Sequence, residues 1–304
     1  MGKETPKRVI DQRMEVVSGI VEAMKEKGLR WFSGLGFSTA PRNPLSGTVY
    51  RGRNRLLLSF VASAKGYEDP RWVTFSQARD AGWKMRKGAR SSVVEKWKMF
   101  SFEKGGDEGE SEDCDPGAVV RFARCVGYWS VFNASEFYNA PEYLPEQLDD
   151  DAGRIADLLI RSSRCPVHES FSDIASYYPD SDAVRIPLRR QYVSNGVFAR
   201  DLLHEMIHST GHPGALARKL CGRFGDPDYA FEELVAELGS LFAASDVGLG
   251  LADMGDAHYE RHVAYLQSWI KVLEKDPDKL FQAASLASVA ADYLAERVHA
   301  LPRE

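Results

Sequence analysis

The chain has 304 residues, of which 44% are hydrophobic, 11% aromatic and 27% charged, a composition typical of one or two soluble globular domains. No apolar run approaches the roughly 18 residues that span a membrane, and the N-terminus lacks the apolar segment of a secretory signal. The four cysteines are scattered and form no C-x-x-C pair, which excludes a disulfide framework and a cysteine-based zinc module. We therefore expect a cytoplasmic protein with no membrane association.

The formal net charge of −5 conceals a division along the chain. Residues 1–104 contain 21 Lys and Arg against 10 Asp and Glu, whereas residues 105–304 contain 18 against 34. Such asymmetry predicts a nucleic-acid-binding part joined to a part of different function. The alternative is that the basic half simply docks on the acidic half.

The first predicted helix covers residues 8–27, where apolar residues recur on one face and Gly28 provides a stop signal. Residues 34–47 are rich in glycine and proline, which predicts a loop. Residues 54–64 are mostly apolar, and their length fits either a helix or a buried strand.

Two strands are predicted next, at residues 93–102 and 118–132, because both segments are rich in Val, Phe, Tyr and Trp. The acidic, glycine-containing stretch between them, residues 105–117, is predicted to be a mobile hairpin loop. Residues 141–151 read PEYLPEQLDDD, which is typical of a linker between domains.

After the linker, the pattern predicts a helix over residues 152–163 and a turn and strand over residues 177–187. Two further helices are predicted at residues 257–273 and 281–299. The candidate metal-binding residues lie between these elements, in residues 204–208 and 228–244.

Residues 204–208 read HEMIH, which is the H-E-x-x-H pattern. On a helix, residues four apart lie on one face, so His204 and His208 would direct two imidazoles at one metal ion. Glu205 would lie beside that ion, where it could take a proton from water. An apolar stripe opposite the histidines and a stop signal at Gly211 favour a packed helix over a chance match.

A third ligand is expected on the next predicted helix, residues 228–244. Glu233 and Glu237 share one side of it, whereas Glu232 points elsewhere. We predict Glu233 as the third ligand, because two His and one Glu with an open position form a catalytic zinc site. Glu237 would accept a hydrogen bond from a ligand histidine. Glu232 or Glu237 as the ligand is an alternative, as is a solvated helix face, and His212 does not point with the pair.

Such a site has the parts for peptide hydrolysis. Zinc would polarise the scissile carbonyl, and Glu205 would take a proton from water and pass it to the leaving amine. Mn²⁺ or Co²⁺ can occupy the same ligands. The residue that stabilises the oxyanion is not identified; Tyr229, Tyr259 and His262 are candidates only by proximity in the sequence.

Aromatic and cationic residues alternate through the N-terminal half. Cations follow a phosphate backbone and exposed rings stack on unpaired bases, so this pattern favours single-stranded over duplex DNA. No recognition-helix or zinc-finger signature indicates a preferred sequence. The alternative for the tryptophans is that they belong to the core, whereas the cations are rarely buried. The predicted DNA-binding residues are Tyr50, Arg51, Arg53, Arg55, Arg71, Trp72, Trp83, Lys84, Arg86, Lys87, Arg90, Lys96 and Lys98.

Five segments, in this order, resemble the family of ArdC-type plasmid antirestriction proteins, which is related to N-terminal regions of conjugative-plasmid primases. They are residues 43–58 (NPLSGTVYRGRNRLLL), 71–90 (RWVTFSQARDAGWKMRKGAR), 128–137 (YWSVFNASEF), 202–212 (LLHEMIHSTGH) and 229–240 (YAFEELVAELGS). Five segments in order are far more specific than H-E-x-x-H alone.

The resemblance implies a single-stranded-DNA-binding domain followed by a zinc metallopeptidase-like domain, and a role in protecting incoming conjugative DNA in the recipient cell. Carried onto this chain, the family's metal residues fall on His204, His208 and Glu233, with the glutamate of the H-E-x-x-H pattern as base. We therefore predict an α+β protein of two domains. Residues 1–145 would form a basic α/β DNA-binding domain, and residues 150–304 a mainly helical zincin-like domain.

Two other functions use the same two halves. In a purely steric single-stranded-DNA-binding protein the metal site would be non-catalytic, but a structural site does not need a base such as Glu205. A DNA-dependent metalloprotease would act on proteins bound to DNA, so that its substrate would be a protein or peptide.

Overall fold

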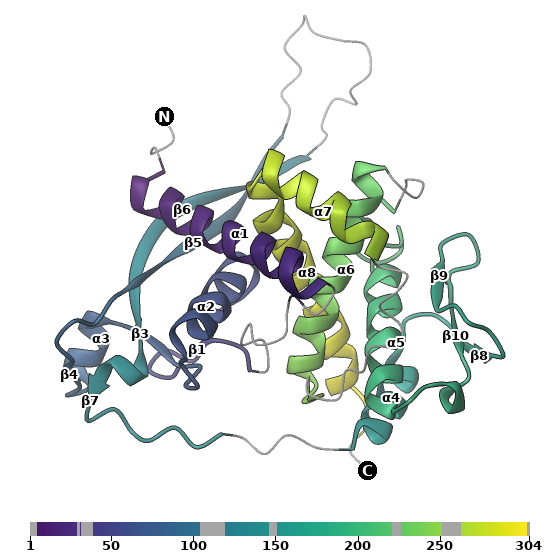
Figure 1. Ribbon diagram of the computed structural model, residues 1–304, viewed down its shortest axis with the longest axis horizontal. Coiled ribbons are helices and arrows are strands. Elements are labelled where there is room, and N and C mark those ends of the chain that lie inside the picture. Colours follow the sequence, from purple (N-terminus) through teal and green to yellow (C-terminus); the bar gives the residue numbers. More distant parts are fainter. Residues whose placement is uncertain are drawn as a thin grey trace, which may run out of the picture.

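The computed structural model describes residues 5–28, 31, 39–103, 119–145, 151–220, 226–250 and 263–302. Both halves of the chain contain helices and strands, which confirms the predicted α+β class (Figure 1). The N-terminal elements are α1 (Lys7–Lys27), β1 (Arg42–Asn43), β2 (Thr48–Val49), α2 (Gly52–Lys65), β3 (Trp72–Thr74), α3 (Phe75–Asp80), β4 (Lys84–Met85), β5 (Ser92–Glu103), β6 (Val119–Asn133), the 3-10 turn η2 (Ala134–Glu136) and β7 (Phe137–Tyr138).

The N-terminal half is built on a three-stranded antiparallel sheet in the order β3–β6–β5. Strands β5 and β6 form a long hairpin, and its register shifts between Lys96 and Trp97, where a β-bulge interrupts the pairing. The two strands predicted from residues 93–102 and 118–132 are thus confirmed. The loop predicted at residues 105–117 lies outside the described residues.

Two side-chain amides cover the outer edge of β5. Gln12 on α1 exchanges hydrogen bonds with the backbone N–H and C=O of Val93, and Asn54 on α2 does the same with Glu95. Each amide takes the place of a neighbouring strand, so backbone groups at the sheet edge are satisfied. The apolar segment at residues 54–64, which fitted a helix or a strand, is part of helix α2.

The C-terminal half is mainly helical, with one small sheet in the order β8–β10–β9 beside helix α5. Helix α6 packs against α5, α7 and α8, and α5 also packs against α4. The helices predicted at residues 152–163 and 281–299 are confirmed. The helices of the described residues do not include one that is both long and apolar enough to cross a membrane. The C-terminal elements are α4 (Ala152–Ser162), β8 (Val167–Ser170), β9 (Ser176–Tyr178), β10 (Ala183–Pro187), the 3-10 turn η3 (Arg189–Gln191), α5 (Asn195–Ser209), α6 (Pro227–Asp246), α7 (Val263–Lys275) and α8 (Asp278–His299).

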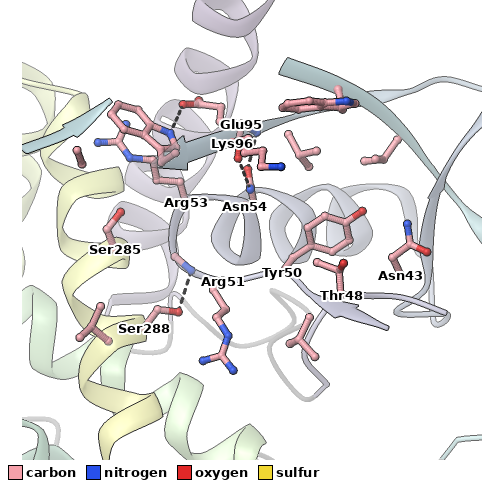
Figure 2. A pocket seen from close by; sticks show the side chains of 18 of the residues that line it. Asn43, Thr48, Tyr50, Arg51, Arg53, Asn54, Glu95, Lys96, Ser285 and Ser288 are labelled. Atoms are coloured by element: carbon pink, nitrogen blue, oxygen red, sulfur yellow. Dashed lines mark hydrogen bonds between the residues drawn. The ribbon is translucent and has the colours of Figure 1, made fainter. Parts of the chain in front are cut away.

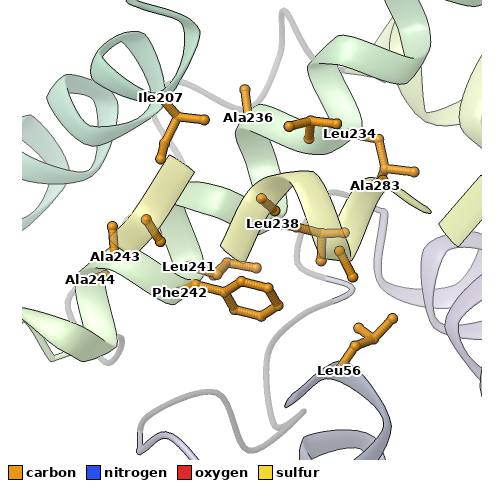
Figure 3. Close-up of a cluster of buried hydrophobic side chains, with 14 of the residues drawn as sticks. Leu56, Ile207, Leu234, Ala236, Leu238, Leu241, Phe242, Ala243, Ala244 and Ala283 are labelled. Atoms are coloured by element: carbon orange, nitrogen blue, oxygen red, sulfur yellow. The ribbon is translucent and has the colours of Figure 1, made fainter. Parts of the chain in front are cut away.

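One hydrophobic core extends through both halves of the chain. Figure 3 shows Leu56 of α2 in the same cluster as Leu241 and Phe242 of α6 and Ala283 of α8. The opposite charges of the two halves also meet, as the docking alternative expected. Among the described residues, the ion pairs between them include Arg13–Asp278, Lys25–Glu274, Arg51–Asp292 and Arg55–Asp246. Part of the charge division therefore serves the contact between the two halves.

Candidate metal centre and nucleic-acid surface

Helix α5 holds the H-E-x-x-H residues in a fixed, buried position. It begins after Ser194, whose hydroxyl accepts a hydrogen bond from the N–H of Val197 and so caps the helix. Phe198, Leu202 and Met206 are fully buried and form the apolar face that the periodicity predicted. The two histidines lie in the last two turns of this anchored helix.

Helix α6 approaches α5 closely at a glycine. A Cβ atom on Gly239 would lie 2.9 Å from Cγ2 of Ile207 on α5, which is closer than real Cβ contacts allow. The start of α6 is held by Trp269 of α7, whose indole N–H donates to the carbonyl of Ala230 at 2.8 Å. These contacts bring the glutamates of α6 opposite the histidines of α5.

His204, His208 and Glu233 form a converging donor set, with one ligand atom from each lying within 4.8 Å of the others. The Nε2 atom of His204 is 3.4 Å from Oε2 of Glu233, and Nε2 of His208 is 3.6 Å from Oε1. Two imidazole nitrogens and one carboxylate in this arrangement fit a divalent cation. Within the described part of the chain, no other cluster of His, Cys, Asp and Glu meets this condition.

The second nitrogen of His204 faces a carboxylate backed by an arginine. Nδ1 of His204 is 3.6 Å from Oε2 of Glu237, and Nη2 of Arg200 donates to Oε1 of Glu237 at 2.5 Å. Arg200 also donates from Nε to the hydroxyl of Ser240. A carboxylate at Nδ1 favours the tautomer in which Nε2 carries the lone pair. Glu237 thus lies where it could orient the imidazole ring of His204.

The second nitrogen of His208 has an equivalent partner that the sequence did not indicate. Its Nδ1 atom is 3.4 Å from Oε1 of Glu232, and Arg218 donates to the same oxygen at 2.7 Å. Glu232 therefore faces the site, and the expectation that it points elsewhere was wrong. His208 lies one turn beyond His204, so its ring meets a different side of α6.

The charges of the centre stabilise one another. Burial alone would raise the pKa of Glu233, but His208, His204 and a hydrogen bond from Tyr229 lower it to about 2. Burial alone would lower the pKa of His204, but the carboxylates of Glu233 and Glu237 hold it well above its ordinary value. The imidazole of His204 and the carboxylates around it thus favour each other's charged forms.

Glu205 is buried beside the donor set. Burial raises the pKa of its carboxyl above the ordinary value, although the two histidines oppose that rise. Its Oε2 atom accepts a hydrogen bond of 2.6 Å from the backbone N–H of Tyr177 on β9. One carboxylate oxygen of Glu205 is therefore held by the edge strand β9.

A polar cluster fixes strand β9 next to Glu205. The Tyr177 hydroxyl donates to Oδ1 of Asp182 at 2.8 Å, and Arg164 binds the same carboxylate. His212 stands outside the donor set, with Nε2 3.9 Å from Asp182, as its position beyond the helix predicted. Of the residues considered for the oxyanion, Tyr229 bonds to Glu233, whereas Tyr259 and His262 lie outside the described residues.

Four of the predicted DNA-binding residues are buried. Tyr50, Trp72 and Trp83 are 9%, 1% and 8% exposed, so their rings offer little surface on which a base could stack, contrary to the expected role in DNA binding. Arg55 is 3% exposed, because it pairs with Asp246 and lies over the ring of Phe242. These four residues build the core and the contact between the halves.

Two further predicted cations have partners within the chain. Arg71 binds Asp69 through two nitrogens and also donates to the carbonyl of Pro141. Arg51 forms an ion pair with Asp292 of α8. The remaining predicted cations, apart from the half-buried Arg53, are exposed. They are Lys84, Arg86, Lys87 and Arg90 near β4, and Lys96 and Lys98 on β5.

Exposed indole rings lie beside cations on the β5–β6 hairpin. Trp97 and Trp129 are 38% and 43% exposed. The guanidinium carbon of Arg53 is 4.4 Å from the Trp97 ring centre, and Nζ of Lys96 is 5.7 Å from that of Trp129. Trp129 was missed because a YW pair within a strand-like segment gives no indication of which ring reaches the surface.

Comparisons with known proteins give matches for both halves of the chain. Residues 10–132 match the family described as the N-terminal domain of anti-restriction factor ArdC, and residues 154–286 match a zincin-like metallopeptidase family. The crystal structure of the metal-free antirestriction ArdC protein from R388 plasmid is 29% identical and covers 96% of this chain and 100% of that chain, with a TM-score of 0.72. Its Mn(II)-bound structure is similar at a TM-score of 0.70.

A protein of Sinorhizobium fredii, the uncharacterized protein y4eC, is 32% identical over 95% of this chain and 93% of its own length. This chain belongs to the family of ArdC-type antirestriction proteins. Two DNA primases TraC of Escherichia coli are each 33% identical over 87% of this ArdC-type chain. The match covers only 25% and 18% of those primases, so the chain spans a quarter of their length or less.

Proposed function

We propose that this ArdC-type protein binds single-stranded DNA without sequence preference and thereby protects incoming conjugative DNA in the recipient cell. Residues 1–145 would carry the DNA-binding function and residues 150–304 the metal centre. The observation that carries the DNA-binding part is the pair of exposed indoles, Trp97 and Trp129, each beside a cation on one hairpin. Exposed rings with adjacent cations suit unpaired bases on a phosphate backbone.

The metal centre is proposed to hold Zn²⁺, with Mn²⁺ or Co²⁺ as alternatives, on His204, His208 and Glu233. A divalent cation there would supply Lewis-acid chemistry, polarising a carbonyl and making water more acidic. Glu205 would accept the water proton at Oε1 and pass it to the leaving amine, while the N–H of Tyr177 holds its other oxygen. This residue set is suited to peptide hydrolysis.

A DNA-dependent metalloprotease that cleaves DNA-bound proteins is the second candidate function. It is favoured by the position of Glu205, which is buried beside the donor set and held by an edge strand. A purely steric single-stranded-DNA-binding protein would not need that carboxylate.

The Glu205→Gln variant separates these functions, because the amide keeps the shape of the side chain but cannot act as the base. We expect it to bind metal as the wild type does and to lose any peptidase activity on proteins bound to single-stranded DNA. If the variant still protects conjugating DNA from restriction in recipient cells, protection is steric. If protection is lost with metal and DNA binding intact, it depends on hydrolysis.

DNA binding is tested by fluorescence anisotropy with a labelled single-stranded oligonucleotide over a salt series. We expect affinity to fall steeply with salt, because each contacted phosphate releases counterions, and to depend little on base sequence. A flat salt dependence, or tighter binding to duplex DNA of the same length, would contradict the proposal.

A further inference from the structure

A groove of about 1110 Å³ lies between the β5–β6 hairpin and helix α8. Figure 2 looks into it, with Ser285 and Ser288 of α8 on one side and Tyr50 and Lys96 of the N-terminal half on the other. The donor set of the metal centre does not line this groove. It is therefore a separate feature that both halves of the chain build.

The groove has a positive character that nucleic acid would complement. The two acidic residues that line it, Glu95 and Asp292, are each paired with an arginine. Arg53 and Lys96 also line it, and neither forms an ion pair with a carboxylate in the part of the chain that the structure describes. The three cations that line the groove, Arg51, Arg53 and Lys96, thus outnumber its two carboxylates.

One aromatic wall of the groove is held rigidly. The indole N–H of Trp97 donates to Oε2 of Glu95 at 2.9 Å, and Arg13 binds both oxygens of that carboxylate. Arg53 lies over the ring of Trp97. A ring fixed by its own nitrogen and by a stacked guanidinium loses little entropy when a base joins the stack.

The second aromatic ring lies flat on the sheet, and a glycine makes this possible. A Cβ atom on Gly127 would lie 2.5 Å from the Trp129 ring atom Cη2, so any larger residue would displace the ring. Gly127 pairs with Lys96 of β5, which places that ammonium group beside the same ring. The sheet therefore presents Trp129 as a flat, 43% exposed platform in the groove.

The opposite wall comes from the C-terminal half. Leu286 and Val289 of α8 line the groove and are 37% and 51% exposed. Helix α8 is held close by Gly52 of α2, whose N–H donates to the hydroxyl of Ser288 at 2.8 Å. A strand in the groove would thus contact both halves of the molecule.

We propose that one strand of DNA lies in this groove, with a base stacked on Trp129 and phosphates directed to Arg53 and Lys96. The inference rests on the proposed DNA-binding function and adds its location and the participation of α8. An unpaired base is required, because the bases of a duplex are already stacked and have no free face for the ring.

Substitutions at two positions test the aromatic platform by anisotropy with a single-stranded oligothymidylate. Trp129→Ala should weaken binding on the order of 10- to 100-fold, the range for loss of one aromatic stack, and Trp129→Phe should recover part of it. Gly127→Ala should weaken binding in the same direction by lifting the ring. Phe75→Ala and Gly250→Ala are matched controls, because Phe75 is an exposed ring outside the groove and a Cβ on Gly250 would meet no atom of the described residues within 4 Å.

Substitutions at a third position, Val289, test the α8 wall. Val289→Glu would place a carboxylate opposite the cations, and we expect at least about a tenfold loss of affinity that increases at low salt. The glutamine of Val289→Gln has nearly the same shape as that glutamate but no charge, so this variant should bind the oligonucleotide with an affinity close to that of the wild type. Photocrosslinking of an oligonucleotide containing 4-thiothymidine to the full chain should label peptides containing Trp129 and Val289.

The outcomes separate this inference from the function on which it rests. If the wild type does not bind the oligonucleotide, the proposed function fails. If the wild type binds and the folded Trp129→Ala and Val289→Glu variants bind equally well, DNA lies elsewhere and the groove inference alone is overturned. Crosslinks confined to residues 84–90 would likewise overturn the groove inference and leave the DNA-binding function intact.

Discussion

Replacement of Arg200 by Met removes the cation that backs the carboxylate beside His204. Arg200 and Glu237 are both 7% exposed, and their side chains meet at 2.5 Å. Loss of one partner leaves the other as an uncompensated buried charge, with only the nearby imidazole to offset it. We therefore expect the metal-free variant to lose about 3–5 kcal/mol of unfolding free energy in urea denaturation.

A double variant, Arg200→Met with Glu237→Leu, separates stability from metal binding. Replacement of both charges by apolar side chains of similar volume is often neutral or stabilising, so the unfolding free energy should return to within about 1 kcal/mol of wild type. Metal affinity should not recover, because Nδ1 of His204 has lost its acceptor. We expect a loss of about 10- to 100-fold, equivalent to about 1.4–2.7 kcal/mol.

Chelator competition with Zn²⁺ and Mn²⁺ measures this affinity. Arg79→Met is the control, because Arg79 pairs with Asp80 on the surface and its loss should change stability by less than about 1 kcal/mol. A folded double variant with wild-type metal affinity would refute the orienting role of Glu237. An Arg200→Met variant as stable as the control would show that the buried pair does not form.

Three further results are expected. Metal affinity should weaken as the pH falls through the raised pKa of His204, by about tenfold per pH unit, because the cation displaces that proton; titrations with metal at a series of pH values check this. The stability of the metal-free protein has the opposite pH dependence. Protonated His204 adds to the unfolding free energy at low pH, and this contribution is lost as the pH rises through the pKa of His204 in the folded state. Gly239→Ala should force α6 away from Ile207, cost about 1–3 kcal/mol in thermal or urea unfolding and weaken metal binding, and an unchanged affinity would show that the helix spacing is not critical. Trp72→Ala should cost about 3–5 kcal/mol of stability, and a folded variant should keep wild-type DNA affinity, because the Trp72 ring is 1% exposed.

The donor set was predictable because helical spacing is a local property. His204 and His208 are four residues apart on one helix, and Glu233 lies on the next helix, so periodicity alone placed the three side chains on suitable faces. The structure brings these three together within 4.8 Å. Arg200, four residues before His204, could have been found by the same spacing.

The outer partners of the centre depend on how the helices pack. Which of two neighbouring glutamates meets His208 depends on the crossing of α5 and α6, so Glu232 was placed on the wrong side. Arg218 lies in the segment after α5 and follows no periodic pattern. The hydrogen bond from β9 to Glu205 joins residues 28 apart, which local sequence does not specify.

The sequence by itself determined which residue types are available for the proposed function: a histidine pair and glutamates on two neighbouring helices, and an N-terminal half rich in cations and rings. The tertiary structure decided which of those rings are accessible. Trp72 and Trp83 are covered by neighbouring elements, whereas Trp97 and Trp129 remain exposed on the hairpin. The physical reason is that residue type and helical spacing are local, but burial depends on which distant segment packs over a side chain.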